Sequence, residues 1–318
     1  MAPSAWTFIV PGDPNQNTGG YRYVRQLATA LNTAGQPARL VGLDGQFPRP
    51  DHIALDAMER ELAALPEGTT VILDGLAMSA MPEVLARHSQ RLLLVGLVHH
   101  PLADEAGLSQ AEQDWFFDAE KQALASTGTV ITTSRYTARR LRDFGVTGGR
   151  VVTAEPAVDD GVFAVGATRS DQSAPNAKVL RLLCVAHLSE RKAQHQLLEA
   201  LAGLKTLDWH CTLAGSDTRS PAYGERIHSL VSELGLQERV TLTGELDESA
   251  LLAAYQNADL FVFPSTYEGY GMVVDEALAA GLPVLSSDGG ALADTADKPG
   301  AITFTAPSSC TTDRPSPA

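Results

Sequence analysis

Residues 259–281, which read DLFVFPSTYEGYGMVVDEALAAG, constrain the fold of this 318-residue chain more than any other stretch. The apolar run at 259–265 predicts a strand, and the apolar residues after Gly271 recur at helical spacing until Gly281. Gly269 and Gly271 separate these elements, so we expect a strand, a tight turn and a helix in succession. A turn of this kind presents backbone N–H groups at the positive end of a helix, where a phosphate is stabilised.

Two glutamates lie in this stretch, eight positions apart. Glu268 lies in the predicted turn, within reach of a neutral, hydroxyl-bearing group, and Glu276 lies about two turns into the predicted helix. Each alone has an ordinary explanation, because glutamates are common before glycine turns and on solvated helix faces. Together, behind an apolar strand that ends in Pro-Ser, they predict a ligand-binding turn that also contains Tyr270.

The composition narrows the class of protein. Hydrophobic residues make up 44% of the chain and charged residues 19%, as in globular proteins, and the length suffices for two domains. The net charge of −14 argues against a nucleic-acid partner and against membrane contact other than a peripheral one. The first residues do not resemble a signal peptide and no apolar run approaches the ~18 residues of a membrane span, so we expect a reducing cytoplasm.

The three cysteines, Cys184, Cys211 and Cys310, lie far apart in the sequence. They are odd in number and lack metal-ligand spacing, and the first two fall in apolar runs, so we expect neither a disulfide framework nor a metal site. The chain also has no D-x-D triplet, and we therefore expect no divalent metal at the ligand site. The sequence does not indicate an oligomeric state.

Predicted strands and helices alternate along the chain, which implies parallel sheets covered by helices on both faces. The periodicity disappears where Ala, Gly, Ser, Asp and Pro accumulate, so we place a linker at 156–178 between domains at 1–155 and 179–305. The predicted strands are 6–10, 38–43, 70–74, 92–98, 130–133, 150–153, 180–186, 209–214, 240–243, 259–265, 283–287 and 300–305. Besides the helix after Gly271, the predicted helices are 21–34, 53–65, 111–126, 136–144, 193–204, 223–234 and 251–257.

The first strand is followed by PGDPNQNTGG at 11–20, a loop rich in turn formers, and then by a helix. A strand, a glycine-rich loop and a helix begin a Rossmann-like unit. The dinucleotide fingerprint G-x-G-x-x-G is absent, so we predict no NAD site. Gly19 and Gly20 belong either to an ordinary connection or to a loop over a ligand.

The strand at 92–98 is followed by His99-His100-Pro101. Ligands of open α/β sheets bind beyond the carboxyl ends of the strands, and a histidine there can hydrogen-bond a sugar or phosphate or exchange a proton. His99 is the better candidate, and His100 takes this role if the strand ends one residue later. A purely structural role remains open, and a metal half-site lacks further ligands nearby.

Arg191 and Lys192 lie between the strand at 180–186 and the helix that follows it. Two adjacent cations at this position would neutralise a diphosphate, arginine through its planar fork and lysine as a point charge. The ordinary alternative is a solvated basic pair.

The pattern E-G-Y-G-x4-E that begins at Glu268 resembles the E-x7-E motif of the retaining group 1 glycosyltransferases (glycosyltransferase family four), which have the GT-B fold and use nucleotide sugars. Residues 187–193, HLSERKA, resemble the G-R-L-x-x-x-K-G element of that family, and residues 156–163 resemble its P-x-G-V-D-x-x-x-F segment. The resemblance covers most of residues 5–305. It implies an α/β protein with two Rossmann-like, doubly wound parallel-sheet domains that face each other across a cleft.

The resemblance also implies roles for individual residues. The first glutamate of the motif contacts the donor sugar, the second contacts the ribose, and the cations of the second element bind the pyrophosphate. Implied catalytic residues are His99, Arg191, Lys192 and Glu268; implied donor-binding residues are Gly19, Gly20, Gly215, Leu246, Gly269, Tyr270, Gly271 and Glu276.

Several positions depart from the family pattern. His187 stands where an arginine is frequent, Ala193 replaces the glycine after the lysine, and Asp294 replaces the glutamate of the D-x-G-G-x-P-E element. We therefore expect an altered donor affinity or pH dependence. Residues 306–318, APSSCTTDRPSPA, lack periodicity where the family continues with helices, and we interpret them as an irregular tail that reflects truncation or a shifted reading frame of the second domain.

The implied function is the metal-independent transfer of a sugar, with retention of anomeric configuration, from a UDP- or GDP-linked donor to a carbohydrate or other hydroxyl-bearing acceptor, without a cofactor. Two alternatives remain open: a non-catalytic relative that binds nucleotide weakly, and a GT-B sugar-nucleotide epimerase. The sequence specifies neither the base and sugar of the donor nor the acceptor.

Overall fold

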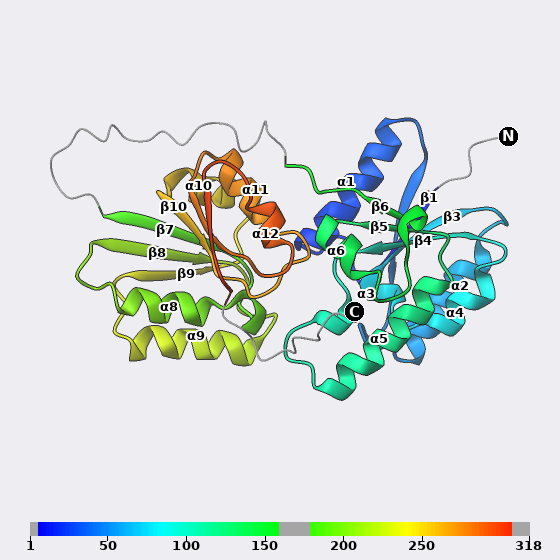
Figure 1. Ribbon diagram of the computed structural model, residues 1–318, viewed down its shortest axis with the longest axis horizontal. Coiled ribbons are helices and arrows are strands. Elements are labelled where there is room, and N and C mark those ends of the chain that lie inside the picture. The colour runs from blue at the N-terminus through cyan, green and yellow to red at the C-terminus, as the bar shows by residue number, and fades with distance from the viewer. Residues whose placement is uncertain (1–5, 159–178, 307–318) are drawn as a thin grey trace. The chain divides into compact units, whose positions relative to one another are not determined.

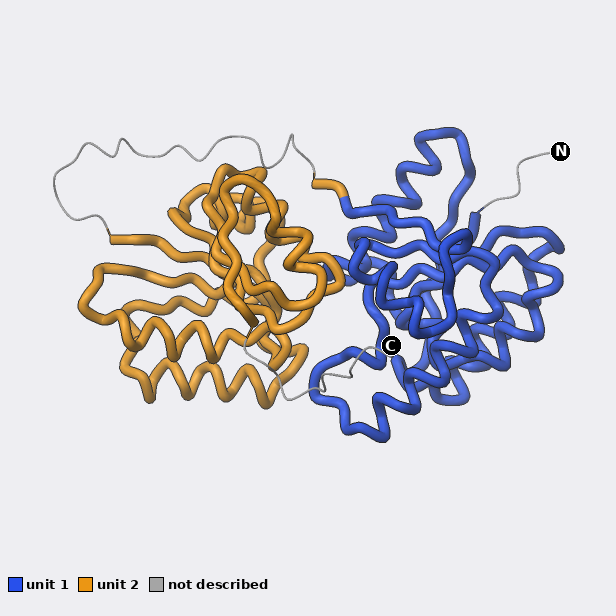
Figure 2. Tube along the Cα trace, in the orientation of Figure 1, with its two compact units in different colours: residues 1–156 blue, residues 157–318 orange. Residues whose placement is uncertain are grey.

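A computed structural model of the chain describes residues 6–158 and 179–306. The chain divides into two compact units, Met1–Pro156 and Ala157–Ala318 (Figure 2). Most of the predicted linker, 159–178, and the tail from 307 onward lie outside the described residues. The linker and the truncation of the second domain therefore stay predictions.

Unit 1 is built on a six-stranded parallel sheet in the order β2-β1-β3-β4-β5-β6 (Figure 1). Alternate residues of its strands enter two hydrophobic clusters, one shared with α2, α4 and α5 and the other with α1, so both faces are covered, as an apolar parallel sheet requires. The elements are β1 (Trp6–Pro11), α1 (Gly19–Thr33), β2 (Ala38–Leu43), α2 (His52–Ala64), β3 (Thr70–Asp74), α3 (Gly75–Met78), α4 (Pro82–His88), β4 (Leu93–Val98), η1 (Leu102–Asp104), α5 (Gln110–Ala125), β5 (Thr129–Thr132), α6 (Arg135–Arg140), η2 (Gly148–Arg150) and β6 (Val151–Thr153).

Unit 2 repeats this architecture with the strand order β12-β11-β10-β7-β8-β9, again all parallel. Helices α8 and α9 cover one face of its sheet, and α10, α11 and α12 lie on the other (Figure 1). The elements are β7 (Leu180–Val185), η3 (Glu190–Lys192), α8 (Gln194–Ala202), β8 (Trp209–Ala214), α9 (Pro221–Glu233), β9 (Val240–Gly244), α10 (Glu248–Asn257), β10 (Leu260–Phe263), α11 (Met272–Ala279), β11 (Val284–Ser287), α12 (Leu292–Thr295) and β12 (Ala301–Phe304).

The two parallel sheets confirm the predicted fold class, and each predicted strand has a counterpart in the described residues. Helices α3, α4 and α12 were not predicted, because four to seven residues are too few to display a helical period. The helix predicted at 136–144 is wrong at its end: α6 stops at Arg140, and the chain continues in turns closed by i→i+3 hydrogen bonds.

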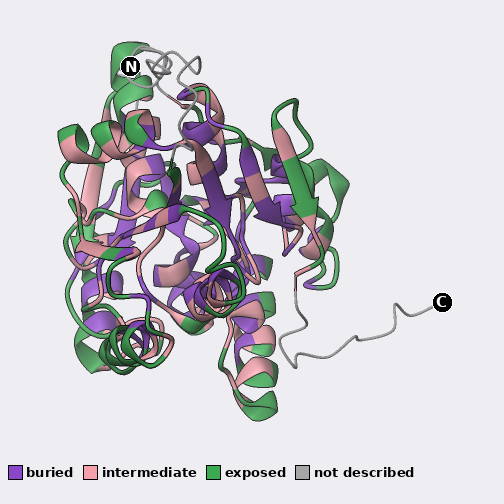
Figure 3. Cartoon of the chain, turned by 90° about the vertical axis from the view of Figure 1, so that its left-hand side faces the viewer, coloured by how far each residue is buried: buried purple, intermediate pink, exposed green. Residues whose placement is uncertain are grey.

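Buried residues run along the central strands, and exposed residues gather on the outer sides of the helices (Figure 3). Within residues 6–158 and 179–306, none of the helices combines the length and the apolar character needed to cross a bilayer.

Candidate functional site

In unit 2, the loops after β7 and β10 are hydrogen-bonded to each other. The backbone carbonyl of Arg191 accepts hydrogen bonds from the Thr266 N–H (2.8 Å) and the Thr266 hydroxyl (3.1 Å). These bonds are possible because β10 pairs directly with β7, so their carboxyl ends lie side by side. The loop that carries the two cations is thereby fixed against the turn that carries Glu268.

Arg191, Lys192 and Glu268 form an ion cluster at this point, referred to below as the cation–carboxylate cluster. The Lys192 ammonium and the Arg191 guanidinium (3.2 Å) both contact Oε1 of Glu268. The Ser265 hydroxyl donates to the same oxygen at 2.5 Å. The structure therefore brings together the three unit 2 residues for which the sequence predicted a catalytic role.

Burial and charge act in opposite directions in the cluster. Burial disfavours ionisation of Glu268, but attraction to Lys192 and Arg191 outweighs it and holds the pKa of Glu268 well below its ordinary value. Burial lowers the pKa of Lys192, and Glu268 counteracts this shift. The Lys192 ammonium also lies 5.1 Å from the centre of the Phe263 ring, a cation–π contact that accompanies its partial desolvation.

The glycine turn leads into α11 as predicted. Gly271 is the N-cap of this helix with φ +95°, a conformation that favours glycine, and no side chain caps the helix start. The loop after β11 supports the turn from behind: the Ala291 N–H donates to the Glu268 carbonyl (2.8 Å), and the Thr295 hydroxyl donates to the Tyr270 carbonyl (2.6 Å). The arrangement combines two cations with an uncapped, positive helix end.

Glu276 lies about one turn into α11, not two as the sequence suggested, because the helix begins only at Met272. Its carboxylate is buried and accepts a hydrogen bond from the Tyr255 hydroxyl (2.9 Å). The explanation of Glu276 as a solvated helix residue is therefore wrong. The Tyr270 hydroxyl donates to Asp275 at 2.7 Å.

The remaining unit 2 candidates also follow carboxyl ends of strands. Gly215 follows β8, and a side chain at this position would collide with the carbonyl oxygen of Ala186, at 2.1 Å. Leu246 follows β9 and packs against the core of unit 2. Ala193 is the N-cap of α8 and has φ +53°, which explains why the resembled element carries a glycine there.

His187 lies in the loop after β7. Burial, reinforced by Lys192 and Arg191, lowers its pKa to about 4. His187 is thus uncharged at neutral pH and does not replace the positive charge of the arginine in the resembled element.

In unit 1, His99 is the first residue after β4, and its Nε2 lies 3.0 Å from Oδ2 of Asp74 at the end of β3. The His99 carbonyl accepts hydrogen bonds from the hydroxyls of Thr133 (3.2 Å) and Thr137 (3.0 Å). Asp74 was not among the predicted site residues. Its position at the end of the apolar run TVILD was the available signal, since β3 and β4 are neighbours in the sheet.

Gly19 and Gly20 are the first residues of α1, with Thr18 as N-cap, so the loop ends earlier than predicted. Gly20 nevertheless lies against His99, because a Cβ added to it would be 3.3 Å from the imidazole Nε2. His100 has a different environment: its Nε2 lies 2.8 Å from Glu105. His100 was to replace His99 as the candidate only if the strand ended one residue later. Because β4 ends at Val98, His99 remains the candidate.

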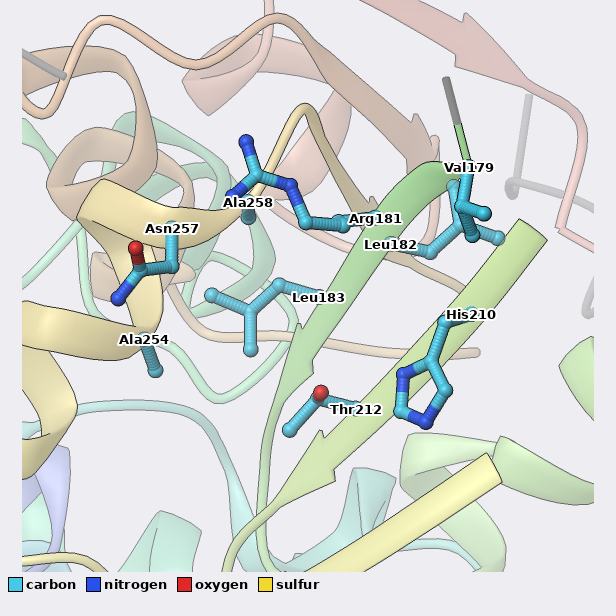
Figure 4. Close-up of a pocket in the computed structure, with 9 residues that line it drawn as sticks. All are labelled: Val179, Arg181, Leu182, Leu183, His210, Thr212, Ala254, Asn257 and Ala258. Atoms are coloured by element: carbon cyan, nitrogen blue, oxygen red, sulfur yellow. The ribbon is translucent and has the colours of Figure 1, made fainter. Parts of the chain in front are cut away.

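A cavity of about 480 Å³ lies along β7, β8 and the end of α10 (Figure 4). No predicted site residue lines it. Among its polar residues, Arg181 pairs with Asp259, and Asn257 donates to the carbonyl of Ala253. In the described part of the chain, no group of three or more His, Cys, Asp or Glu residues is arranged to hold a metal ion.

The family of glycosyl transferases group 1 matches residues 167–304. The match spans all of the strands of unit 2. The D-inositol 3-phosphate glycosyltransferase 2 of Catenulispora acidiphila is 30% identical over 180 residues, which are 53% of this chain and 42% of that protein. The corresponding enzyme of Nocardia farcinica is 31% identical over 195 residues, 57% of this chain and 42% of that protein. The chain therefore spans about two-fifths of the length of these curated relatives.

Solved structures share the fold. Sucrose-phosphate synthase from Thermosynechococcus elongatus superimposes with a TM-score of 0.78 at 23% identity, covering 95% of this chain and 86% of that one. Anabaena HepE in complex with UDP-glucose gives a TM-score of 0.71 at 18% identity, covering 95% and 85%. Both similarities extend over both units, whose fold is that of GT-B glycosyltransferases.

Proposed function

We propose that this chain is a glycosyltransferase that binds a nucleoside diphosphate sugar on unit 2 and transfers the sugar to a hydroxyl-bearing acceptor. The observation that carries the proposal is the cation–carboxylate cluster beside the uncapped start of α11. The names of the relatives support it, as does the UDP-glucose bound to the structural neighbour from Anabaena.

The diphosphate would be bound by charge. Arg191 and Lys192 supply two positive charges, and the first N–H groups of α11 add the positive end of the helix dipole. The negative charge on the diphosphate grows as the bond to the sugar breaks. These groups therefore stabilise the transition state more than the bound donor, which is the requirement for catalysis.

Glu268 would bind the sugar through its second oxygen. Lys192 and Ser265 donate to Oε1 and the Arg191 guanidinium lies 3.2 Å from it, whereas no residue in the described ranges donates to Oε2. The side chain keeps 10% of its surface exposed, enough for contact with a sugar hydroxyl. Glu276, whose carboxylate accepts a hydrogen bond from Tyr255 of α10, would hold the ribose.

The proposed reaction breaks the bond between the anomeric carbon and the phosphate oxygen and forms a bond from that carbon to the acceptor oxygen. The acceptor proton passes to the leaving diphosphate, so no metal and no protein nucleophile is required, and the configuration is retained. By the same family resemblance, His99, paired with Asp74, would contact a sugar or acceptor hydroxyl. Retention and metal independence rest on the E-x7-E resemblance.

The proposal is tested with Lys192→Met and Glu268→Gln. UDP, GDP and ADP are titrated calorimetrically, and donor consumption is followed by NMR with the matching sugar nucleotides, with and without EDTA. We expect one nucleotide to bind, Lys192→Met to weaken it about tenfold or more, and Glu268→Gln to reduce turnover more than nucleotide affinity.

Arg181→Met is the matched control, because it also removes the cation of an ion pair in unit 2, at the opposite end of the same strand. It should leave nucleotide affinity unchanged. Binding of no nucleotide, or equal losses in Lys192→Met and Arg181→Met, would contradict the proposal. Binding without turnover would indicate the non-catalytic alternative, and donor interconversion without an acceptor would indicate the epimerase.

A further inference from the structure

Glu120 is a buried carboxyl group in unit 1 that the proposed reaction does not use. It lies on α5 and is only 2% exposed. It accepts hydrogen bonds from the backbone N–H groups of Leu102 (2.9 Å) and Ala103 (3.0 Å) and from the Ser79 hydroxyl (2.9 Å). Burying a carboxylate costs free energy, because it loses its hydration. A buried carboxylate that accepts three hydrogen bonds therefore calls for an explanation.

The donors come from two short segments. Leu102 and Ala103 begin η1, which follows His99-His100-Pro101. Ser79 closes α3, whose N-cap is Asp74. Because Asp74 is bonded to His99, Glu120 connects the segment that follows the histidine with the segment that follows its aspartate partner.

We propose that Glu120 is a positioning residue that fixes the relative placement of Asp74 and His99, and thereby the orientation of the His99 imidazole. The Asp74 carboxylate can only accept a hydrogen bond, so Nε2 of His99 carries the proton and Nδ1 is left as an acceptor for a ligand hydroxyl. The catalytic consequence rests on the proposed function. The positioning itself does not.

Other contacts also hold the loop after His99 within unit 1. Asp104 in η1 forms a bidentate pair with Arg140, and His100 pairs with Glu105 within the loop. Neither contact reaches α3. Glu120, in contrast, accepts hydrogen bonds from both segments.

The test uses Glu120→Gln, which keeps the size of the side chain but turns an amide donor toward one of the backbone N–H groups. The His99 imidazole is titrated by NMR, and hydrogen exchange of the Leu102 and Ala103 amides is measured. We expect the His99 titration midpoint to shift by about half a unit or more, faster exchange of both amides, and unchanged nucleotide affinity. Turnover should fall about tenfold, with KM for the donor unchanged.

Glu59→Gln is the matched control, because Glu59 is bonded to Arg87 and His88 elsewhere in unit 1. Ser79→Ala removes only one bond to Glu120 and replaces Glu120→Gln if that variant does not fold; it should shift His99 in the same direction by a smaller amount. A His99 titration that is the same in Glu120→Gln or Ser79→Ala as in Glu59→Gln overturns the proposal. The NMR and exchange results remain decisive even if the wild-type chain turns over no donor.

Discussion

His187 follows β7 at the position where the resembled element carries an arginine. Burial and the neighbouring cations lower its pKa to about 4, so it is neutral at pH 7.5. We predict that His187→Arg tightens UDP binding about tenfold at this pH, since a charged hydrogen bond to phosphate contributes roughly 1.5 kcal/mol more than a neutral group. Affinity is measured by calorimetric titration with UDP, or with GDP or ADP if one of these is the nucleotide that the chain binds.

The pH dependence gives a second signal. A bound diphosphate attracts a proton to His187, so wild-type affinity should rise as the pH falls from 7.5 toward 5.5, more than in His187→Arg, where the charge is permanent. His210→Arg is the control, because it adds the same charge on the neighbouring strand β8, in the lining of the cavity. Equal affinities in all three proteins would mean that His187 does not face the phosphate.

At the scale of elements, the loop after β11 holds the glycine turn before α11. Gly290 has φ +64°, and a Cβ there would lie 2.5 Å from the carbonyl oxygen of Glu268. We predict that Gly290→Ala displaces the turn, lowers the free energy of unfolding by about 2 kcal/mol or more and weakens nucleotide binding at least tenfold. Urea denaturation and calorimetry measure the two effects.

Gly281→Ala separates backbone strain from displacement of the turn. Gly281 has a similar φ of +75°, but a Cβ there meets no atom within 4 Å. This control should cost about 1 kcal/mol of stability and leave nucleotide binding intact. Equal losses of binding in both variants would show that the turn does not depend on its contact with Gly290.

At the scale of the whole molecule, the two units contain buried carboxyl groups that respond to pH in opposite directions. The pKa of Glu268 in unit 2 is lowered, whereas burial raises the pKa of Glu120 in unit 1 to about 7, against its three hydrogen bonds. The folded state therefore binds the Glu120 proton more tightly than the unfolded chain. The stabilisation of the folded state by this proton is complete below pH 4.5 and is lost as the pH rises through 7.

We predict that the free energy of unfolding of unit 1 decreases by about 3 kcal/mol between pH 4.5 and 7.5, because Glu120 loses its proton. This decrease should be absent in Glu120→Gln. Urea denaturation at several pH values measures the slope, with Trp209→Phe as the common background so that Trp6 and Trp115 report on unit 1. Glu59→Gln should keep the wild-type slope above pH 5, because the pKa of Glu59 is lowered. A slope that is the same with and without Glu120 would refute the prediction.

The sequence by itself determined the succession of strands and helices, the parallel sheets and the turn before α11. These features follow from local patterns, namely apolar runs, helical spacing and glycine positions, which act within a few residues. The same local patterns identified Arg191, Lys192, Glu268 and His99 as strand-end residues. Helices such as α3 and α4 are too short to display a helical period, so the local sequence did not predict them.

Only the tertiary structure decided which of these residues meet. Lys192 and Glu268 are 76 positions apart and form an ion pair because β10 lies next to β7. Asp74 joins His99 because β3 lies next to β4, and Glu120 reaches Ser79 across 41 positions. The physical reason is that strand order and helix packing are settled by burial of the whole core, so contacts between distant residues carry no signal in the local sequence.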